Sequence, residues 1–129
     1  MPIKVLIADD HVFYREGVRA FLENEPDIEV VGEAGDGEEV LAKAAELKPD
    51  VILMDLKMPG INGIEATRRI RETEVRAGIP RIPIIGMTAH ALYNDRQKCL
   101  EAGMDDYLSK PFQPERLKEL ILAYARAGR

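Results

Sequence analysis

The chain has 129 residues, 46% of them hydrophobic and 32% charged, which is typical of one globular domain with a single core. Its formal net charge of −5 argues against direct binding to nucleic acid or a membrane surface, and its single cysteine excludes an internal disulfide bond. No segment has the length of a membrane span or the layout of a signal peptide, so we expect a cytoplasmic location and one domain over residues 1–129.

Short apolar runs rich in Val and Ile alternate with segments in which apolar residues recur at helical spacing. The runs predict strands at residues 3–8, 29–34, 51–54, 84–87 and 107–108. The run at 51–54 is the most apolar, which favours a central position in the sheet. The periodic segments predict helices from Tyr14 to near Pro26, around residues 40–45, over 64–74 and 92–102, and around 117–124, with Gly103 as the C-cap of the fourth.

Five strand–helix units in strict alternation predict an α/β fold with a doubly wound, five-stranded parallel sheet and helices on both faces. Because crossovers are right-handed and the strands are parallel, the carboxyl ends of all strands lie along one edge of the sheet. Ligands bind at that edge in folds of this class. The polar residues that follow each strand are therefore the candidates for a functional site.

Polar residues stand at the ends of four of the predicted strands. They are three carboxylates, a hydroxyl and an ammonium group: Asp9 and Asp10 after the first strand, Asp55 after the third, Thr88 after the fourth, and Lys110 after the fifth. Three carboxylates at close range repel one another, and at least one takes up a proton unless a cation lies between them. A set of oxygen ligands with room for water suits Mg²⁺.

The same residues have the chemistry that phosphoryl transfer needs. A carboxylate beside Mg²⁺ can attack phosphorus and form an acyl phosphate, and Asp55 is the candidate nucleophile. The transferring group needs positive charge at its oxygens, which Mg²⁺ and Lys110 would supply. The hydroxyl of Thr88 could donate a hydrogen bond to a third oxygen.

Each of these residues also has a structural interpretation. Asp9 and Asp10 could cap the first helix, and Thr88 could cap the fourth. A single lysine such as Lys110 is most often a surface residue. An unpaired Asp55 behind an apolar strand would be unfavourable in a purely structural role. The joint occurrence of these residues at strand ends favours a functional site.

The remaining side chains that could bind a metal are two histidines and one cysteine. None of them lies in the sequence where it would complete a zinc site. His11 and His90 are interpreted as polar loop residues, and Cys99 as a packing residue of a helix.

The residues around these strand ends resemble the receiver domain of two-component response regulators, over essentially the whole chain. The resemblance is carried by residues 7–10 (IADD), 51–60 (VILMDLKMPG), 87–89 (MTA) and 105–112 (DDYLSKPF). It implies the flavodoxin-like (βα)5 receiver fold. It also implies a phosphorylation-dependent signalling switch rather than a metabolic enzyme, because such a domain catalyses only its own phosphoryl transfer and dephosphorylation.

The resemblance assigns a role to each polar residue of the edge. The phosphoacceptor would be Asp55, modified by a sensor histidine kinase or a histidine phosphotransfer domain. Mg²⁺ would be held by four groups, namely the carboxylates of Asp9, Asp10 and Asp55 and the backbone carbonyl of Lys57. Lys110 would bind the phosphoryl group, and the bond between Lys110 and Pro111 would be cis, which would aim the lysine into the site.

Thr88 and Tyr107 resemble the switch pair of the family. After phosphorylation, the Thr88 hydroxyl would move toward the phosphoryl group, and Tyr107 would rotate from an exposed to a buried rotamer. The rearrangement would alter the surface of the fourth helix, the fifth strand and the fifth helix, which we expect to include Arg96 and Glu119.

The partners that the resemblance implies are a phosphoryl donor and a downstream output domain or protein, and homodimer formation on phosphorylation is compatible with it. Residues 10–34 resemble receivers attached to helix-turn-helix transcription factors. Residues 87–91 and 98–107 resemble receivers fused to hybrid sensor kinases. The kinase, the output pathway and the attachment to further domains therefore stay open.

Three other functions compete with the signalling switch. An aspartate-nucleophile phosphatase of the haloacid-dehalogenase kind places its nucleophile after the first strand in an Asp-x-Asp pattern, whereas Asp9 and Asp10 are adjacent. A flavodoxin-like nucleotide or flavin binder needs a phosphate-cradling loop at that point, and two acids would repel phosphate. A receiver-like interaction module that is not phosphorylated would have no use for the acid, threonine and lysine set.

Overall fold

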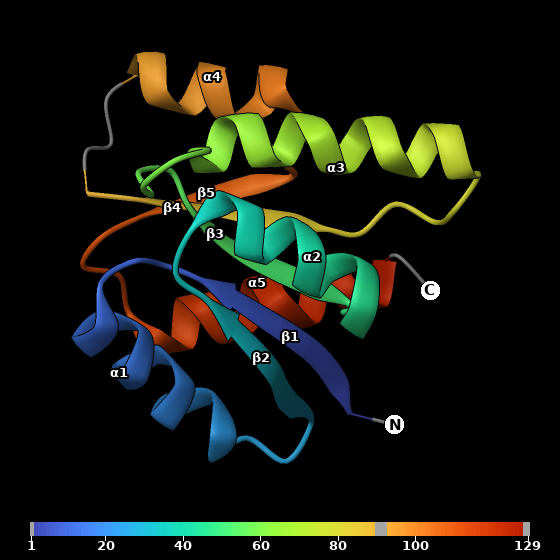
Figure 1. Ribbon diagram of the computed structural model, residues 1–129. Coiled ribbons are helices and arrows are strands. Elements are labelled where there is room, and N and C mark those ends of the chain that lie inside the picture. Colours follow the sequence, from blue (N-terminus) through green and yellow to red (C-terminus); the bar gives the residue numbers. More distant parts are fainter. Residues whose placement is uncertain (1, 90–92, 128–129) are drawn as a thin grey trace.

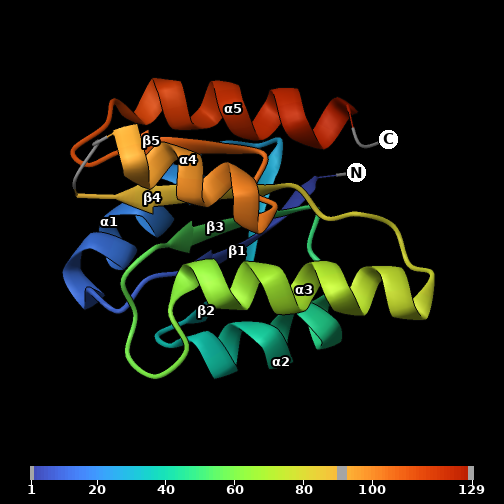
Figure 2. The same ribbon diagram turned by 90° about the horizontal axis from the view of Figure 1, so that it is seen from above.

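The computed structural model describes residues 2–89 and 93–127. Within them, five parallel strands form one sheet in the order β2-β1-β3-β4-β5, with helices on both faces (Figure 1, Figure 2). The strands are β1 (Ile3–Ala8), β2 (Ile28–Ala34), β3 (Val51–Asp55), β4 (Ile84–Thr88) and β5 (Asp106–Ser109). The helices are α1 (Val12–Glu23), α2 (Gly37–Leu47), α3 (Gly63–Ala77), α4 (Tyr93–Ala102) and α5 (Pro114–Ala127). The predicted doubly wound fold is confirmed.

Two apolar clusters join the helices to the sheet, one on each face. Helices α1 and α5 contribute Leu22 and Ile121 to the first cluster. Helices α2, α3 and α4 contribute Val40, Ile70 and Cys99 to the second, which confirms the packing role predicted for the cysteine. Figure 2 shows α5 on one side of the sheet and α2 and α3 on the other. No helix in the described residues is both long enough and apolar enough to cross a membrane.

Strand β3 occupies the centre of the sheet, as its apolar sequence predicts. It pairs with β1 on one side and with β4 on the other. All of its residues are buried, because both faces and both edges of the strand are covered. A strand in this position needs apolar side chains on both faces, and Asp55 at its carboxyl end is the exception that calls for a chemical explanation.

The bounds of several elements differ from those predicted. Helix α3 continues to Ala77, beyond the predicted end near Glu74, and terminates at Gly78 in the left-handed conformation with φ of 65°. Its last turn carries charged residues, so hydrophobic periodicity alone does not reveal it. The predicted start of the fourth helix at residue 92 lies outside the described residues. Gly103 follows α4 with φ of 109°, which agrees with the predicted C-cap.

The loop between β3 and α3 is held close under the carboxyl edge of the sheet. A Cβ atom on Gly63, the first residue of α3, would lie 2.1 Å from the carbonyl oxygen of Asp55. The side chain of Asn62 caps the helix by accepting a hydrogen bond from the backbone N–H of Glu65 at 2.9 Å. Because only glycine permits this close approach, the loop turns back directly beneath Asp55.

Candidate functional site

Four polar side chains meet at the carboxyl edge of the sheet. Asp55 and Thr88 are the last residues of β3 and β4, and Asp9 and Lys110 follow β1 and β5 directly. Asp9 is completely buried, and Asp55 and Thr88 are each 4% exposed. Two carboxylates therefore lie in the interior, where an uncompensated charge is unfavourable.

The ammonium group of Lys110 lies between these two carboxylates. Its Nζ is 2.7 Å from Oδ2 of Asp9 and 3.6 Å from Oδ2 of Asp55. It also lies 4.2 Å from the centre of the Tyr14 ring, at cation–π distance. Burial, together with the charges of Asp9 and Asp55, raises the pKa of Tyr14 to about 12. Tyr14 therefore stays neutral, and the ammonium group of Lys110 packs against its ring.

The loop after β1 is held by hydrogen bonds that the sequence did not reveal. The backbone N–H of His11 donates to Oδ1 of Asp9 at 2.8 Å. The guanidinium of Arg15, one turn into α1, donates to the carbonyl of Asp9 at 2.6 Å and to Glu33 of β2 at 2.9 Å. These hydrogen bonds fix the backbone that carries Asp9 and Asp10. Arg15 gives no sequence signal for this role, because an arginine in an amphipathic helix is ordinarily a solvent-exposed residue.

Asp9 is held in its charged form. Burial by itself would raise the pKa of Asp9. The hydrogen bond from Lys110, the backbone N–H of His11 and the charge of Lys110 outweigh burial, so the pKa of Asp9 lies below its ordinary value. Asp9 is thus a permanent negative charge at the site near neutral pH.

Asp55 has the opposite character. Burial first, and then the charge of Asp9, raise the pKa of Asp55 to about 6, and the charge of Lys110 only partly opposes them. Oδ1 of Asp55 accepts a long hydrogen bond of 3.4 Å from the backbone N–H of Lys57. Oδ2 is buried and is without a hydrogen-bond partner among the described residues. The ammonium group of Lys110, at 3.6 Å, is an ion-pair partner of this oxygen but does not hydrogen-bond to it, so a closer cation or a proton would stabilise it further.

His11 is an unexpected member of the acidic cluster. Its Nδ1 lies 3.1 Å from Oδ1 of Asp9, 3.3 Å from Oδ1 of Asp10 and 3.6 Å from Oδ2 of Asp55. One potential ligand atom from each of these four residues lies within 4.8 Å of the others. We interpreted His11 from sequence as a polar loop residue, and its only sequence signal was its position next to Asp10.

The cluster fits a divalent cation. Two buried carboxylates, a third that is partly exposed, and an orphaned buried oxygen on Asp55 together form a site with excess negative charge. A cation among them would satisfy Oδ2 of Asp55 and relieve its repulsion with Asp9. Carboxylate oxygens are the ligands that hard divalent cations prefer. The backbone carbonyl of Lys57 stays a predicted further ligand.

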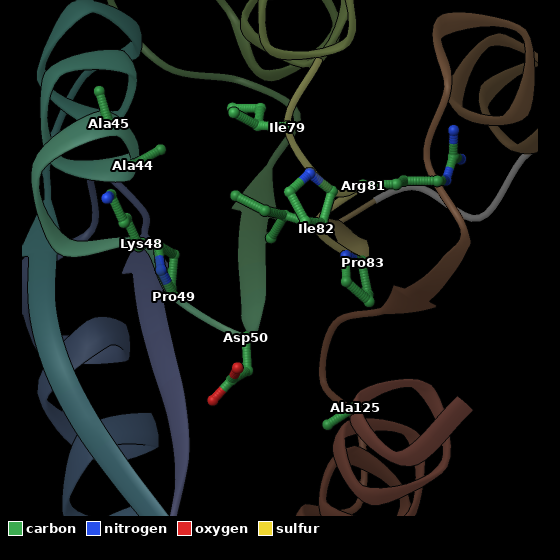
Figure 3. A pocket seen from close by; sticks show the side chains of 11 residues that line it. Ala44, Ala45, Lys48, Pro49, Asp50, Ile79, Arg81, Ile82, Pro83 and Ala125 are labelled. Carbon is green, nitrogen blue, oxygen red and sulfur yellow. The ribbon is translucent and has the colours of Figure 1, made fainter. Parts of the chain in front are cut away.

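A cavity opens beside the cluster and leads to the reactive side chains. It has a volume of about 880 Å³, and its walls include Asp55, Thr88 and Lys110. A second cavity of about 540 Å³ lies among the loops at the opposite edge of the sheet, where Lys48, Asp50 and Arg81 are in its lining (Figure 3). None of the predicted site residues borders the second cavity, so the first is the place where a phosphoryl group would be received.

The residues predicted to form the switch pair lie on neighbouring strands. Thr88 pairs with Ser109 in register, and its carbonyl accepts the backbone N–H of Lys110 at 2.6 Å. Thr88 is therefore the last residue of β4, and its alternative interpretation as the N-cap of the fourth helix concerns a helix start that lies outside the described residues. Tyr107 is half-buried, and the guanidinium of Arg96 lies 5.8 Å from the centre of its ring.

Comparison with known proteins agrees with this geometry. The family model described as the response regulator receiver domain matches residues 5–122. The response regulator protein VraR of Staphylococcus aureus is 39% identical over 126 residues, which cover 98% of this chain and 58% of VraR. The chain thus spans little more than half the length of that relative.

Solved structures of receiver domains superimpose closely on the chain. The receiver domain of the putative response regulator NarL from Mycobacterium tuberculosis has a TM-score of 0.88 at 29% identity, with 97% of each chain covered. The receiver domain of the sensor histidine kinase PA1611 from Pseudomonas aeruginosa has a TM-score of 0.85 at 34% identity, with 98% of this chain and 99% of that chain covered. The latter structure has a magnesium ion coordinated in its active-site cleft.

These matches do not favour the phosphatase or the unphosphorylated module as the function of the site. The family model spans most of the chain, the sheet has the expected strand order, and the acidic cluster lies at the carboxyl edge. The cluster fits the magnesium-dependent phosphoacceptor site of such domains. This chain therefore belongs to the response regulator receiver domain family of two-component signalling proteins.

Proposed function

We propose that the segment 1–129 acts as a single receiver domain in which Asp55 accepts a phosphoryl group in the presence of Mg²⁺. The observation that supports this assignment is Oδ2 of Asp55, which is buried and lacks a hydrogen-bond partner among the described residues. The residue Asp55 borders the cavity beside the acidic cluster, where a donor could deliver a phosphoryl group. Asp9, by contrast, is engaged by Lys110 and by the backbone of His11.

The residues around Asp55 each contribute to phosphoryl transfer. The carboxylate attacks phosphorus, the phosphorus–nitrogen bond to the donor histidine breaks, and the released imidazole takes up a proton. Lys110 moves from between the two aspartates to bind a phosphoryl oxygen, and Thr88 donates its hydroxyl to another. Asp9, Asp10, Asp55 and the backbone carbonyl of Lys57 would hold Mg²⁺, which would supply further positive charge for phosphoryl transfer. Water later hydrolyses the acyl phosphate and returns the domain to its resting state.

The proposed partners follow from the same assignment. The donor is a sensor histidine kinase or a histidine phosphotransfer domain, and the signal passes to an output domain or protein through the surface of α4, β5 and α5. That surface contains Tyr107 and the exposed residues Arg96 and Glu119. We place the domain in the cytoplasm, without direct contact with nucleic acid or membrane, and with homodimer formation on phosphorylation as a further consequence.

Intact-mass spectrometry tests the phosphoacceptor directly. The parent protein, incubated with acetyl phosphate and Mg²⁺, is expected to gain one phosphoryl group, and removing Mg²⁺ with a chelator should prevent the gain. Asp55→Asn should not gain the group under any of these conditions, because the amide is not a nucleophile. Asp50→Asn is the matched control, since Asp50 lies at the opposite edge of the sheet and should leave the reaction unchanged (Figure 3). A normal yield of adduct on Asp55→Asn would overturn the assignment.

A further inference from the structure

The imidazole of His11 lies close to three carboxylates, whereas a hydrogen bond would account for its contact with only one. Its Nδ1 is 3.1 Å from Oδ1 of Asp9, which a hydrogen bond explains. The same nitrogen also lies 3.3 Å from Asp10 and 3.6 Å from Oδ2 of Asp55, and the latter oxygen has no hydrogen-bond partner among the described residues. One nitrogen thus faces two carboxylates from the loop after β1 and a third, that of Asp55, from the end of β3; Asp55 is only 4% exposed.

These separations match the edges of a coordination shell. Around an octahedral cation with bonds of about 2.1 Å, adjacent ligand atoms lie about 3.0 Å apart. The three measured separations, from 3.1 to 3.6 Å, exceed that edge by only a few tenths of an ångström. Small side-chain movements would therefore bring Nδ1 and all three oxygens onto one ion. The His11 side chain is 65% exposed, which leaves the solvent side of the shell open for water or a phosphoryl oxygen.

We propose that Nδ1 of His11 is a direct ligand of the cation bound at this cluster, in addition to the carboxylates of Asp9, Asp10 and Asp55. The proposal rests on the metal site of the proposed function and extends it to a mixed nitrogen and oxygen ligand set. Such a site favours first-row transition-metal dications over the metals that prefer oxygen alone. The cofactor class is therefore Mn²⁺ to Ni²⁺ as well as Mg²⁺.

The ligand set determines which metals respond to loss of the imidazole. Imidazole binds Ni²⁺ strongly, whereas Mg²⁺ prefers oxygen and retains several waters. His11→Ala should therefore weaken Ni²⁺ binding by roughly tenfold or more, but change Mg²⁺ binding by less than about threefold. His90→Ala removes the other histidine of the sequence and controls for nonspecific binding of metal by imidazole.

Two measurements on the full chain test the proposal without reference to phosphorylation. Calorimetric titrations with Ni²⁺ and Mg²⁺ give the affinities of the parent, His11→Ala and His90→Ala. Pulsed electron paramagnetic resonance of bound Mn²⁺ detects a directly coordinated nitrogen through its ¹⁴N modulation. The modulation should be present in the parent and in His90→Ala and absent in His11→Ala, while Mn²⁺ remains bound in all three.

The outcomes separate this inference from the proposed function. If Mn²⁺ binds the parent without ¹⁴N modulation, or if Ni²⁺ binds His11→Ala and the parent equally well, His11 is not a ligand, and the carboxylate metal site still stands. If neither Mn²⁺ nor Mg²⁺ binds the parent, both the inference and the metal-dependent function fail. Loss of Mg²⁺ and Ni²⁺ affinity by the same factor in His11→Ala would indicate a change in the loop and would also overturn the ligand role.

Discussion

Asp9 and Asp55 carry the same side chain on adjacent strands, yet their surroundings shift their pKa values in opposite directions. Lys110 and backbone N–H groups stabilise the charge of Asp9, whereas burial and the charge of Asp9 raise the pKa of Asp55 to about 6. This asymmetry divides the work between them. In the proposed site, Asp9 would bind the metal in its charged form, and the carboxylate of Asp55 would be the reacting group.

The raised pKa makes Asp55 a source of instability at neutral pH. The value rises from 3.8 to about 6, so the folded state binds the proton more tightly than the unfolded chain. Ionisation of Asp55 therefore lowers the free energy of unfolding. This loss is complete well above pH 6, and it disappears as the pH falls from about 6 toward 3.8. In the absence of metal, Asp55→Asn should be more stable than the parent at pH 7.5, by about 1–3 kcal/mol.

Urea unfolding in the presence of a chelator measures this difference. The gain in the free energy of unfolding for Asp55→Asn should be large at pH 7.5 and close to zero near pH 4. Asp50→Asn provides the comparison, because it makes the same change of carboxylate to amide at the opposite edge of the sheet. Equal stability of Asp55→Asn and the parent at both pH values would show that the carboxylate is not strained in the folded protein.

At the level of secondary-structure elements, a buried ion-pair network joins α3 to the strands beside it. Arg71 donates to Glu74 at 2.8 Å and to Asp105 at 2.9 Å, and also to the carbonyls of Ile82 and Gly103, each at 2.8 Å. The side chains of Arg71 and Glu74 are 13% and 6% exposed. This network fixes the loops that enter β4 and β5, and hence the elements that carry Thr88, Tyr107 and Lys110.

Removing the side chain of Arg71 should lower the free energy of unfolding far more than removing that of an exposed arginine of the same helix. Arg71→Ala leaves the buried carboxylate of Glu74 without its cationic partner and with only the backbone N–H of Ile82, at 2.7 Å, as a donor among the described residues. We expect a loss of about 3 kcal/mol in the free energy of unfolding. Arg69→Ala is the control, because Arg69 pairs with Glu65 at 3.2 Å with both side chains about half exposed, and should change stability by less than about 1 kcal/mol. Similar denaturation midpoints for the two variants would contradict the role of the network.

The proposed switch depends on the same elements. Thr88 lies at the end of β4, and Tyr107 of β5 is half-buried beneath Arg96 of α4. Movement of Thr88 toward a phosphoryl group would allow the Tyr107 ring to turn inward and release its contact with Arg96. The resulting change would be confined to the surface of α4, β5 and α5.

Thr88→Ala tests this coupling. With Mg²⁺ and the phosphoryl mimic beryllofluoride, amide chemical shifts around Tyr107 should change in the parent and much less in the variant, while Mg²⁺ affinity stays within about threefold. Thr73→Ala is the control, since the Thr73 hydroxyl donates to the carbonyl of Arg69 at 2.9 Å, on the exposed side of α3. If the Thr88→Ala variant shows the same shifts around Tyr107 as the parent, the threonine does not transmit the signal.

For the molecule as a whole, the proposed metal site would connect the segments that follow β1 and end β3. The carboxylates of Asp9 and Asp10 come from the loop after β1, and that of Asp55 comes from the end of β3. They therefore converge only in the folded chain. A cation that binds this set stabilises the fold by mass action, and each tenfold excess over its dissociation constant adds about 1.4 kcal/mol.

Mg²⁺ should therefore raise the melting temperature of the parent protein. Asp10→Ala should lose most of the gain, because it removes one carboxylate from the cluster, whereas Glu16→Ala, a change at an exposed acid of α1, should keep it. Thermal unfolding at increasing Mg²⁺ concentrations gives the comparison. Identical Mg²⁺-dependent shifts in Asp10→Ala and the parent would remove Asp10 from the set of ligands.

The sequence by itself was sufficient to predict the order of elements, the central position of β3, and the carboxyl edge that holds Asp9, Asp55, Thr88 and Lys110. Strand and helix periodicities are local properties, and a parallel α/β topology places all strand ends on the same edge whatever the details of packing. The positions of the reactive side chains therefore followed from their place at strand ends.

Only the tertiary structure decided which side chains surround these residues. The approach of His11 to three carboxylates, the ring of Tyr14 beside Lys110, the anchoring of the Asp9 backbone by Arg15, and the buried pairs of Arg71 depend on loop paths and rotamers. Such contacts join residues that are distant in sequence or lie in irregular loops, and they obey no periodicity. The same holds for the opposite pKa shifts of Asp9 and Asp55, because burial and neighbouring charges exist only after the chain has folded.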